Sequence, residues 1–204
     1  MTGSRLLVAA FVTAVFLAAA PPASAQSSPR RVEGAVFPGN VIIFQEEAGG
    51  SPAFNSFATF GTVTINMSDV MAIEGEFGVN LGFEQEIKFV LDAAESRPPT
   101  MVTYSANVVA HLVSGHRSAG PFVIAGAGGL TLLERPELGI ATSATFFTLN
   151  AGIGAKFNVT EHWGIRAEYR LIAVVSQDDA PEFFGRDNRF GHRVAAGITF
   201  GAGR

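Results

Sequence analysis

Apolar and polar residues alternate along several stretches of this sequence, and this alternation limits the possible folds more than any other feature. In residues 70–83, Glu74 and Glu76 stand at even positions, whereas the odd positions from Met71 to Phe83 are apolar or glycine. The same alternation runs through residues 144–157, 162–175 and 189–200. Successive side chains of a β-strand point to opposite faces, so each stretch predicts a strand with one apolar and one polar face.

Eight segments separated by turn or loop residues are predicted to be strands. They are residues 34–45, 54–65, 70–83, 101–113, 120–133, 144–157, 162–175 and 189–200. Each is long enough for a tilted strand that crosses a bilayer in about 9–11 residues. Short and long connections follow one another in turn, as they do in transmembrane barrels with short periplasmic turns. Residues 34–45 and 120–133 alternate poorly, and the pattern assigns no faces to them.

The N-terminus has the features of a secretory signal peptide. Arg5 precedes an apolar run from Leu6 to Ala20, and Ala23-Ser24-Ala25 is a cleavage site of small residues. The run is too short to span a bilayer comfortably, so we expect cleavage after Ala25 and no membrane anchor. We therefore expect a signal peptide at 1–25, a periplasmic linker at 26–33, the barrel at 34–200 and a C-terminal tail at 201–204.

The chain as a whole is apolar, but no transmembrane helix is indicated after the signal. Mean hydropathy is +0.29, and charged residues make up only 16% of the sequence. The longest apolar stretch after the signal, residues 121–133, falls short of the roughly 18 residues that a spanning helix needs. Only helices and closed barrels satisfy every backbone group within a bilayer. The expected fold is therefore all-β, an eight-stranded antiparallel up-and-down transmembrane β-barrel.

An internal repeat relates residues 66–77 to residues 158–169 at an offset of 92. Each copy is a turn followed by a strand, and the two strands are four apart in a ring of eight. They should face each other across the lumen, with Glu74 level with Arg166. An eight-stranded lumen is only just wide enough for side chains, which favours a structural network of charges over a selective pore. The predicted network contains Glu74, Glu76, Lys156, Arg166, Glu168, Arg170 and Arg193, with Arg189 on the same face.

The opposite face of each strand should contact lipid. The aromatic residues expected on this face or at its membrane interfaces are Phe77, Phe83, Phe157, Trp163, Tyr169 and Phe200. His192 interrupts the apolar face of its strand.

The turn–strand unit from Asn158 to Arg170 and the closing strand from Arg193 to Phe200 resemble a known family. They are similar to the OmpA-like and Omp25/Omp31-like small outer-membrane barrels, also called outer membrane protein beta-barrel domain or porin-family proteins. The resemblance covers about Gly34 to Phe200. It implies a monomer in the lipids of the bacterial outer membrane, inserted by the barrel-assembly machinery. Members commonly end on an aromatic residue, whereas here Gly201-Ala-Gly-Arg follows Phe200.

Nothing in the sequence forms a catalytic or metal-binding constellation. The histidines are His111, His116, His162 and His192, and none has the spacing of metal ligands. A lipid-modifying enzyme would need a nucleophile beside a base, for which His111 with Ser105 or Ser114 is the available combination. No cysteine is present to act as a thiol nucleophile.

We therefore expect a barrel that is not an enzyme, with no cofactor and no metal. Its role should be structural or surface-facing. A net charge of −4 argues against a nucleic-acid partner. A small-solute pore is the main alternative, followed by a lipid-modifying outer-membrane enzyme. A soluble calyx for an apolar ligand is a further alternative, and it would reverse the two faces.

Overall fold

The computed structural model describes residues 32–46, 51–88, 93–113, 119–181 and 183–202. The predicted signal peptide, most of the predicted linker, His116 and the last two residues lie outside this part of the chain.

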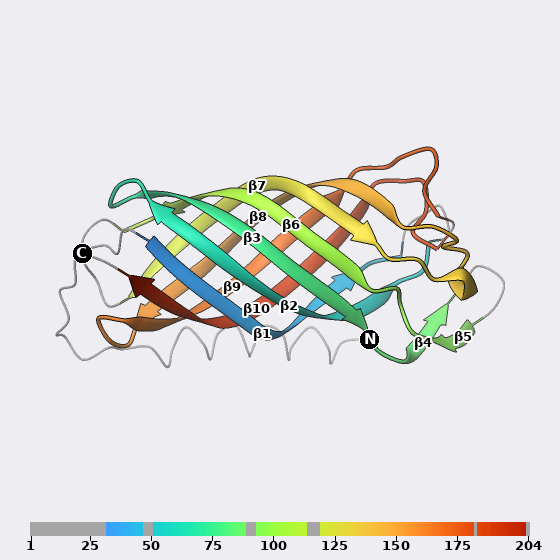
Figure 1. The fold of residues 1–204 in the computed structure, drawn as a ribbon, viewed down its shortest axis with the longest axis horizontal. Coiled ribbons are helices and arrows are strands. Elements are labelled where there is room, and N and C mark those ends of the chain that lie inside the picture. The colour runs from blue at the N-terminus through green and yellow to red at the C-terminus, as the bar shows by residue number, and fades with distance from the viewer. Residues whose placement is uncertain (1–31, 47–50, 89–92, 114–118, 182, 203–204) are drawn as a thin grey trace, which may run out of the picture.

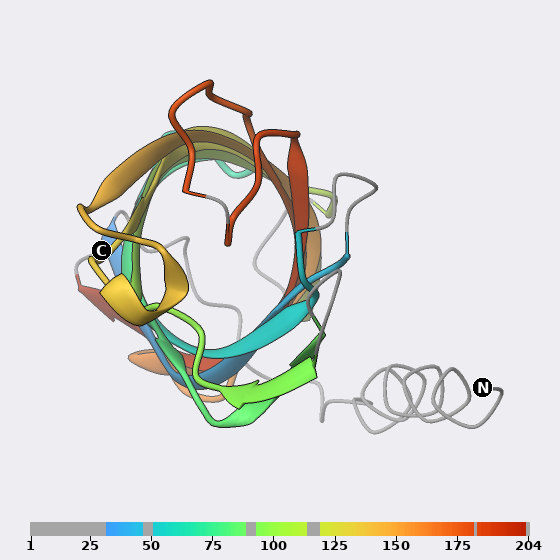
Figure 2. The ribbon, with the colours of Figure 1, turned by 90° about the vertical axis from the view of Figure 1, so that its right-hand side faces the viewer.

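Eight long strands close into an antiparallel barrel (Figures 1 and 2). They are β1 (Val32–Phe44), β2 (Phe54–Asn66), β3 (Met71–Gly82), β6 (Met101–His111), β7 (Ala119–Leu132), β8 (Ala144–Asn158), β9 (Trp163–Val174) and β10 (Arg189–Ala202). Each pairs with its neighbours along the chain, and β1 pairs with β10 to close the ring. The predicted eight-stranded up-and-down barrel is confirmed. Val32 and Glu33 belong to its first strand.

The two ends of the barrel differ in the connections that they carry. Short connections follow β2, β6 and β8 at one end of the barrel, here called the turn end. The longer connections follow β1, β3, β7 and β9 at the other end, here called the loop end. The long connections contain short elements that the alternation did not indicate. These are the hairpin of β4 (Gln85–Lys88) with β5 (Ala93–Ser96) and the 3-10 turn η1 (Pro136–Leu138).

The side chain of Gln85 ties the hairpin to the barrel. Gln85 Nε2 donates to the backbone oxygen of Asn55 at 2.8 Å, and Gln85 Oε1 accepts from the Asn55 N–H at 2.9 Å. Ile87 in β4 is fully buried. Strands of four residues are too short for their alternation to be recognised in a sequence.

A bulge explains the poor alternation of residues 34–45. The register of β1 against β2 shifts between Phe37 and Asn40. Before the shift odd positions such as Phe37 face the lumen, and after it even positions such as Ile42 do. Asn40 secures the bulge, because its Nδ2 donates to the Phe37 carbonyl at 3.0 Å and its Oδ1 accepts from the Ala196 N–H at 2.7 Å. A bulge adds a residue to one strand and exchanges its faces.

Glycines obscure the alternation of β7, whose buried even positions, such as Phe122 and Leu130, face the lumen. Gly126 and Gly128 occupy the positions between them, where the neighbouring strand approaches closely. A Cβ atom on Gly128 would lie 1.9 Å from the backbone oxygen of Tyr104. Glycine is therefore required there by sterics, not by the polarity of the face.

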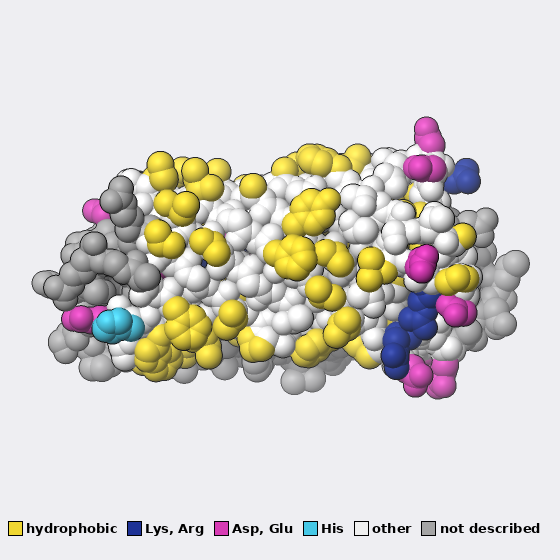
Figure 3. Space-filling model, viewed as in Figure 1, with side chains coloured by type: hydrophobic (Ala, Val, Ile, Leu, Met, Phe, Trp, Pro, Cys, Tyr) yellow, Lys and Arg dark blue, Asp and Glu magenta, His cyan; other side chains and the backbone are white. Residues whose placement is uncertain are grey.

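The outer wall of the barrel is apolar, and charges gather at its ends. Figure 3 shows hydrophobic side chains over the middle of the wall and charged side chains at the two ends of the long axis. Phe77, Phe83, Trp163, Tyr169 and Phe200 are exposed, and Phe157 is half-buried. Among the described residues, no helix has the length and apolar character needed to cross a membrane. Charges inside and apolar side chains outside are the reverse of a soluble calyx.

Candidate functional site: charged lumen and apolar plug

Six charged side chains meet in the middle of the lumen, and all are buried. Strand β3 supplies Glu74 and Glu76, β9 supplies Arg166, Glu168 and Arg170, and β10 supplies Arg193. We call these six residues the lumen network. Three carboxylates face three guanidinium groups, so the formal charges cancel. The alternation of β3, β9 and β10 places all six on inward positions.

The contacts within the lumen network are short and multiple. Arg193 binds Glu76 through two parallel contacts, with Nη1–Oε1 at 2.6 Å and Nη2–Oε2 at 2.7 Å. Arg170 reaches all three carboxylates, Glu74 at 2.9 Å, Glu76 at 3.0 Å and Glu168 at 2.8 Å. Two-pronged guanidinium–carboxylate pairs are geometrically specific as well as strong. The network therefore fixes the relative positions of three strands.

Arg166 joins opposite walls of the barrel. It forms an ion pair with Glu74 of β3 and a second with Glu168 of its own strand at 2.7 Å. Its guanidinium carbon lies 4.6 Å from the ring centroid of Phe122 and 5.7 Å from that of Phe37. Aromatic faces attract a cation that has lost its water. The Arg166–Glu74 contact is the one that the 92-residue repeat predicts.

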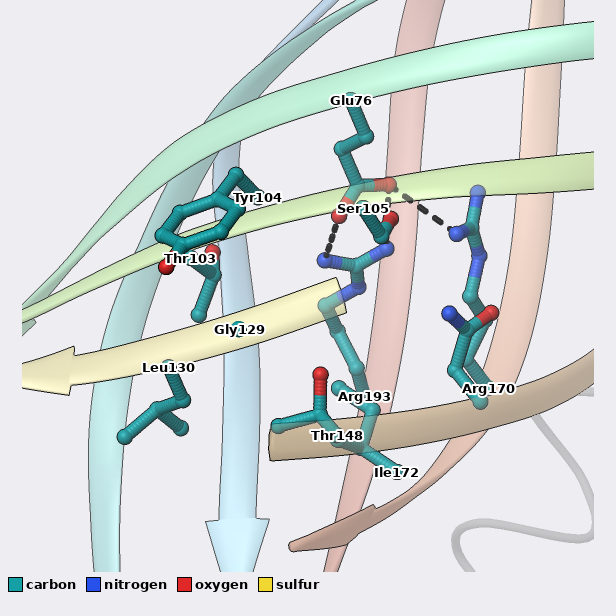
Figure 4. A pocket seen from close by; sticks show the side chains of 11 residues that line it. Glu76, Thr103, Tyr104, Ser105, Gly129, Leu130, Thr148, Arg170, Ile172 and Arg193 are labelled. Carbon is teal, nitrogen blue, oxygen red and sulfur yellow. Dashed lines mark hydrogen bonds and ion pairs between the residues drawn. The ribbon is translucent and has the colours of Figure 1, made fainter. Parts of the chain in front are cut away.

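Two small cavities border the lumen network. One of about 20 Å³ lies beside Glu76, Arg170 and Arg193. In Figure 4 Glu76 points toward both arginines, and Thr148 lies beside Arg193. A second cavity of about 20 Å³ lies toward the turn end. Each has room for about one water molecule.

A separate ion pair lies nearer the turn end. Lys156 of β8 pairs with Glu33 of β1, and Glu33 also accepts from Asn66 Nδ2 at 3.0 Å. Lys156 was predicted among the lumen charges, whereas Glu33 was assigned to the linker and missed. Glu33 shares the inward parity of Ala35 and Phe37, and this parity is the signal that could have identified it.

The loop end of the lumen is filled by apolar side chains. Buried residues of the strands pack there against buried residues of the long loops. This apolar plug consists of Ile42, Phe44, Phe54, Ile87, Met101, Leu130, Leu132, Ile140, Phe146, Ile172, Val174, Ala180, Phe183 and Phe184. Figure 2 looks into this mouth and shows the segment between β9 and β10 dipping into the ring. The sequence predicts an outer loop for this segment and gives no sign of the plug.

Arg189 lies within the apolar plug and binds backbone carbonyl groups. Its Nη2 donates to Pro52 at 2.6 Å and to Gln45 at 3.0 Å, and its Nη1 donates to Phe184 at 3.3 Å. The aromatic rings around its guanidinium are those of Phe44, Phe54 and Phe184, with centroids 4.9–5.5 Å away. Arg189 thus links two loops to the barrel mouth, a role distinct from that of the lumen network.

The comparisons with known proteins agree with this architecture. Residues 9–201 match the family described as outer membrane protein beta-barrel domain. The chain belongs to this family. No curated protein matches the sequence of this outer-membrane barrel.

Solved structures share the fold of this outer-membrane barrel. Neisserial surface protein A (NspA) has a TM-score of 0.57 and 10% identity, over 84% of this chain and 96% of that one. OprG of Pseudomonas aeruginosa has a TM-score of 0.53 and 10% identity, over 88% of this chain and 100% of OprG. The N-terminal barrel domain of P. aeruginosa OprF has a TM-score of 0.50 and 12% identity, over 85% of this chain and 100% of that domain. At these identities the likeness concerns the fold alone.

The histidines of this outer-membrane barrel are dispersed. His111 and Ser105 stand six residues apart on β6, which separates them by roughly 20 Å along the strand, so they do not form a nucleophile–base pair; Ser114 lies outside the described residues. His162 lies in an exposed turn, and His192 lies on the outer wall beside Tyr169. Within the described ranges, no three His, Asp or Glu residues are grouped so that they could hold a metal ion.

Proposed function

We propose that this protein is a non-conducting, non-enzymatic outer-membrane barrel whose lumen is a packed internal support for surface loops. The observation that carries the proposal is the filling of the lumen at two successive levels. Arg170 of the lumen network is 1% exposed, as is Phe184 of the apolar plug. A solute would have to displace both a balanced set of ion pairs and a hydrophobic cluster.

The proposed orientation follows from the connections. The turn end would face the periplasm and the loop end the outside, because transmembrane barrels have short periplasmic turns. A signal peptide cleaved after Ala25 would deliver the chain to the periplasm. The partners would be outer-membrane lipids and, during biogenesis, the barrel-assembly machinery. The barrel would act as a monomer without a nucleic-acid partner.

A buried charge network fits a structural role. A charge in a narrow lumen needs a partner, and removing one partner leaves the other uncompensated. The three acids and three bases of the lumen network meet this requirement within the protein. A pore lined by charges would instead leave them hydrated along an open path.

Conductance tests this proposal against a small-solute pore. The purified, refolded protein in planar bilayers should give no steady conductance steps in 1 M KCl. A variant with residues 176–187 replaced by a short Gly-Ser linker would lose Phe183 and Phe184 but keep the lumen network. It should also stay silent, because the ion pairs still fill the lumen. Steady steps from the natural protein would contradict the proposal.

Cell fractionation tests the location. The mature chain should begin at Gln26 and sediment with outer-membrane markers. Recovery as a soluble periplasmic protein would contradict both the orientation and the surface role.

A further inference from the structure

A polar pair interrupts the apolar outer wall. The hydroxyl of Tyr169 in β9 and Nδ1 of His192 in β10 are 2.6 Å apart, and their rings stack with centroids 6.1 Å apart. Along β10 the outward neighbours of His192 are Phe190 and Val194, both exposed. Leu171, the register partner of His192, is also apolar and exposed. The pair is therefore flanked by apolar side chains of the outer wall.

The pair holds one hydrogen-bond donor more than it can use. A neutral imidazole has one N–H and tyrosine has one O–H, and the contact between them consumes one of the two. If Tyr169 donates, Nε2–H of His192 remains, and if His192 donates through Nδ1, the hydroxyl hydrogen of Tyr169 remains. Neither side chain has a second hydrogen-bond partner among the described residues. A donor without an acceptor is costly within the hydrocarbon layer, so an acceptor should come from the membrane.

The wall beside this pair is hollowed. An open hollow of about 520 Å³ crosses β6, β7, β8 and β9, and the Tyr169 ring forms part of its lining. Small side chains lie along it, namely Ala110, Ala125 and Ala151, between larger ones such as Val123 and Ile153. The rest of its lining is aliphatic or glycine. The hollow is thus an open apolar groove in the outer wall, and Tyr169 of the polar pair forms one edge of it.

We propose that this hollow and the Tyr169–His192 pair together bind one acyl chain of a membrane lipid. The ester carbonyl of the chain would accept the surplus hydrogen, and the hydrocarbon would lie in the hollow over Ala125 and Ala151. An acyl ester unites the two features that the wall requires, an acceptor without a charge and an apolar tail. The site would hold an ordered lipid against β6–β9, a role that goes beyond the support of surface loops.

Solid-state NMR on the full mature chain in nanodiscs tests the site. The probe is dimyristoylphosphatidylcholine carrying ¹³C at the ester carbonyls, and its ditetradecyl ether analogue is the comparison lipid. We expect magnetisation transfer from the lipid carbonyl to the ¹⁵N-labelled ring of His192 or to the Tyr169 ring. We also expect the His192 ring shifts to differ between the ester and ether lipids. Absence of carbonyl transfer together with identical shifts in the two lipids would overturn the proposal.

Two matched variants separate the hollow from the polar pair. Ala125→Leu fills the hollow and leaves the pair in place, so it should reduce carbonyl transfer at least threefold. Ala196→Leu adds the same side chain to an exposed outward position of β10 outside the hollow, and it should leave transfer unchanged. Equal transfer in both variants would overturn the role of the hollow. If each nanodisc held two protein copies and the second copy covered the Tyr169–His192 pair, the pair would lie at a dimer interface. That result would overturn the proposed lipid site.

Discussion

Arg166 and Glu74 lie 92 residues apart in the sequence and form an ion pair across the barrel lumen. Their strands, β9 and β3, are four positions apart in the closed ring of eight. Arg166 is 5% exposed and Glu74 is 0% exposed, so water does not compete for the contact. The pair therefore connects diametrically opposite walls, which backbone hydrogen bonds cannot reach.

Replacing Arg166 with alanine should destabilise the barrel strongly. The change leaves Glu74 and Glu168 with less compensation inside the lumen, and breaking a buried pair typically costs about 3–5 kcal/mol. The free energy of unfolding, measured by urea titration in lipid vesicles, should fall by an amount of this order. Arg97→Ala is the control, because Arg97 is exposed and its contact with Glu84 is 4.0 Å long. Such surface pairs contribute about 0–1 kcal/mol.

Exchanging the partners tests the contact itself. The double variant Glu74→Arg with Arg166→Glu restores one acid and one base across the lumen, so it should recover part of the lost stability. A double variant no more stable than the less stable single variant would show that the two residues act independently.

The sequence predicts the strands and lumen charges wherever inward residues alternate without interruption. Strands β3 and β9 are of this kind, and their charged residues identify the lumen side directly. The faces of β1 could not be predicted, because the bulge between Phe37 and Asn40 exchanges them. A search for alternation with a period of two does not allow for an added residue. Glu33 was missed for a related reason. It stands at the start of that strand, and the stretch of alternating residues before the bulge is too short to be recognised.

The apolar plug could not be predicted because it depends on loop conformation. Phe183 and Phe184 stand in a polar segment with Asp178, Asp179 and Arg186, which is typical of an exposed loop. Only the closed ring brings these rings against Phe44, Phe54 and Phe146. Long-range packing of this kind leaves no period in the sequence.

The cost in stability of a charge on the outer wall should depend on its depth in the bilayer. Phe77 is 61% exposed in the middle of β3, so Phe77→Arg should cost about 2–4 kcal/mol if its position is at the bilayer midplane. Met67, in the turn before β3, is 67% exposed, and Met67→Arg should cost about 0–1 kcal/mol near the interface. Unfolding in lipid vesicles measures both. Equal losses in the two variants would contradict the assignment of the outer wall to lipid.

Arg189 should control the order of the apolar plug. Arg189→Met keeps an apolar side chain of similar length but removes the donors to Gln45, Pro52 and Phe184. Buried carbonyl groups left without donors destabilise their loops. We expect limited proteolysis within residues 176–188 to become several times faster while the barrel strands stay protected.

Arg186→Met is the matched control for the plug, because Arg186 is exposed in the same segment. It should leave the rate of cleavage near that of the natural protein. Cleavage that accelerates equally in both variants would mean that the loss of a positive charge, and not of the buried contacts, opens the loop.

Close packing of strands should make two glycines respond differently to the same substitution. Gly128 faces the lumen, where an added Cβ atom would lie 1.9 Å from the Tyr104 carbonyl oxygen and 2.7 Å from the Ser105 Cα. Both neighbours are backbone atoms, so β6 and β7 would have to separate, and overpacking of this kind costs about 1–3 kcal/mol. Gly75 faces the outer wall, and a Cβ atom there meets nothing within 4 Å.

Gly128→Ala should therefore lower the free energy of unfolding in lipid vesicles. Gly75→Ala should leave it unchanged or raise it slightly, because alanine restricts the unfolded chain and places a methyl group against lipid. The two variants carry the same chemical change in the same kind of strand, so their difference isolates the approach of β6 to β7. If Gly128→Ala were as stable as Gly75→Ala, the lumen would have free space beside Ser105, and the close packing that argues against a pore would be wrong at this level.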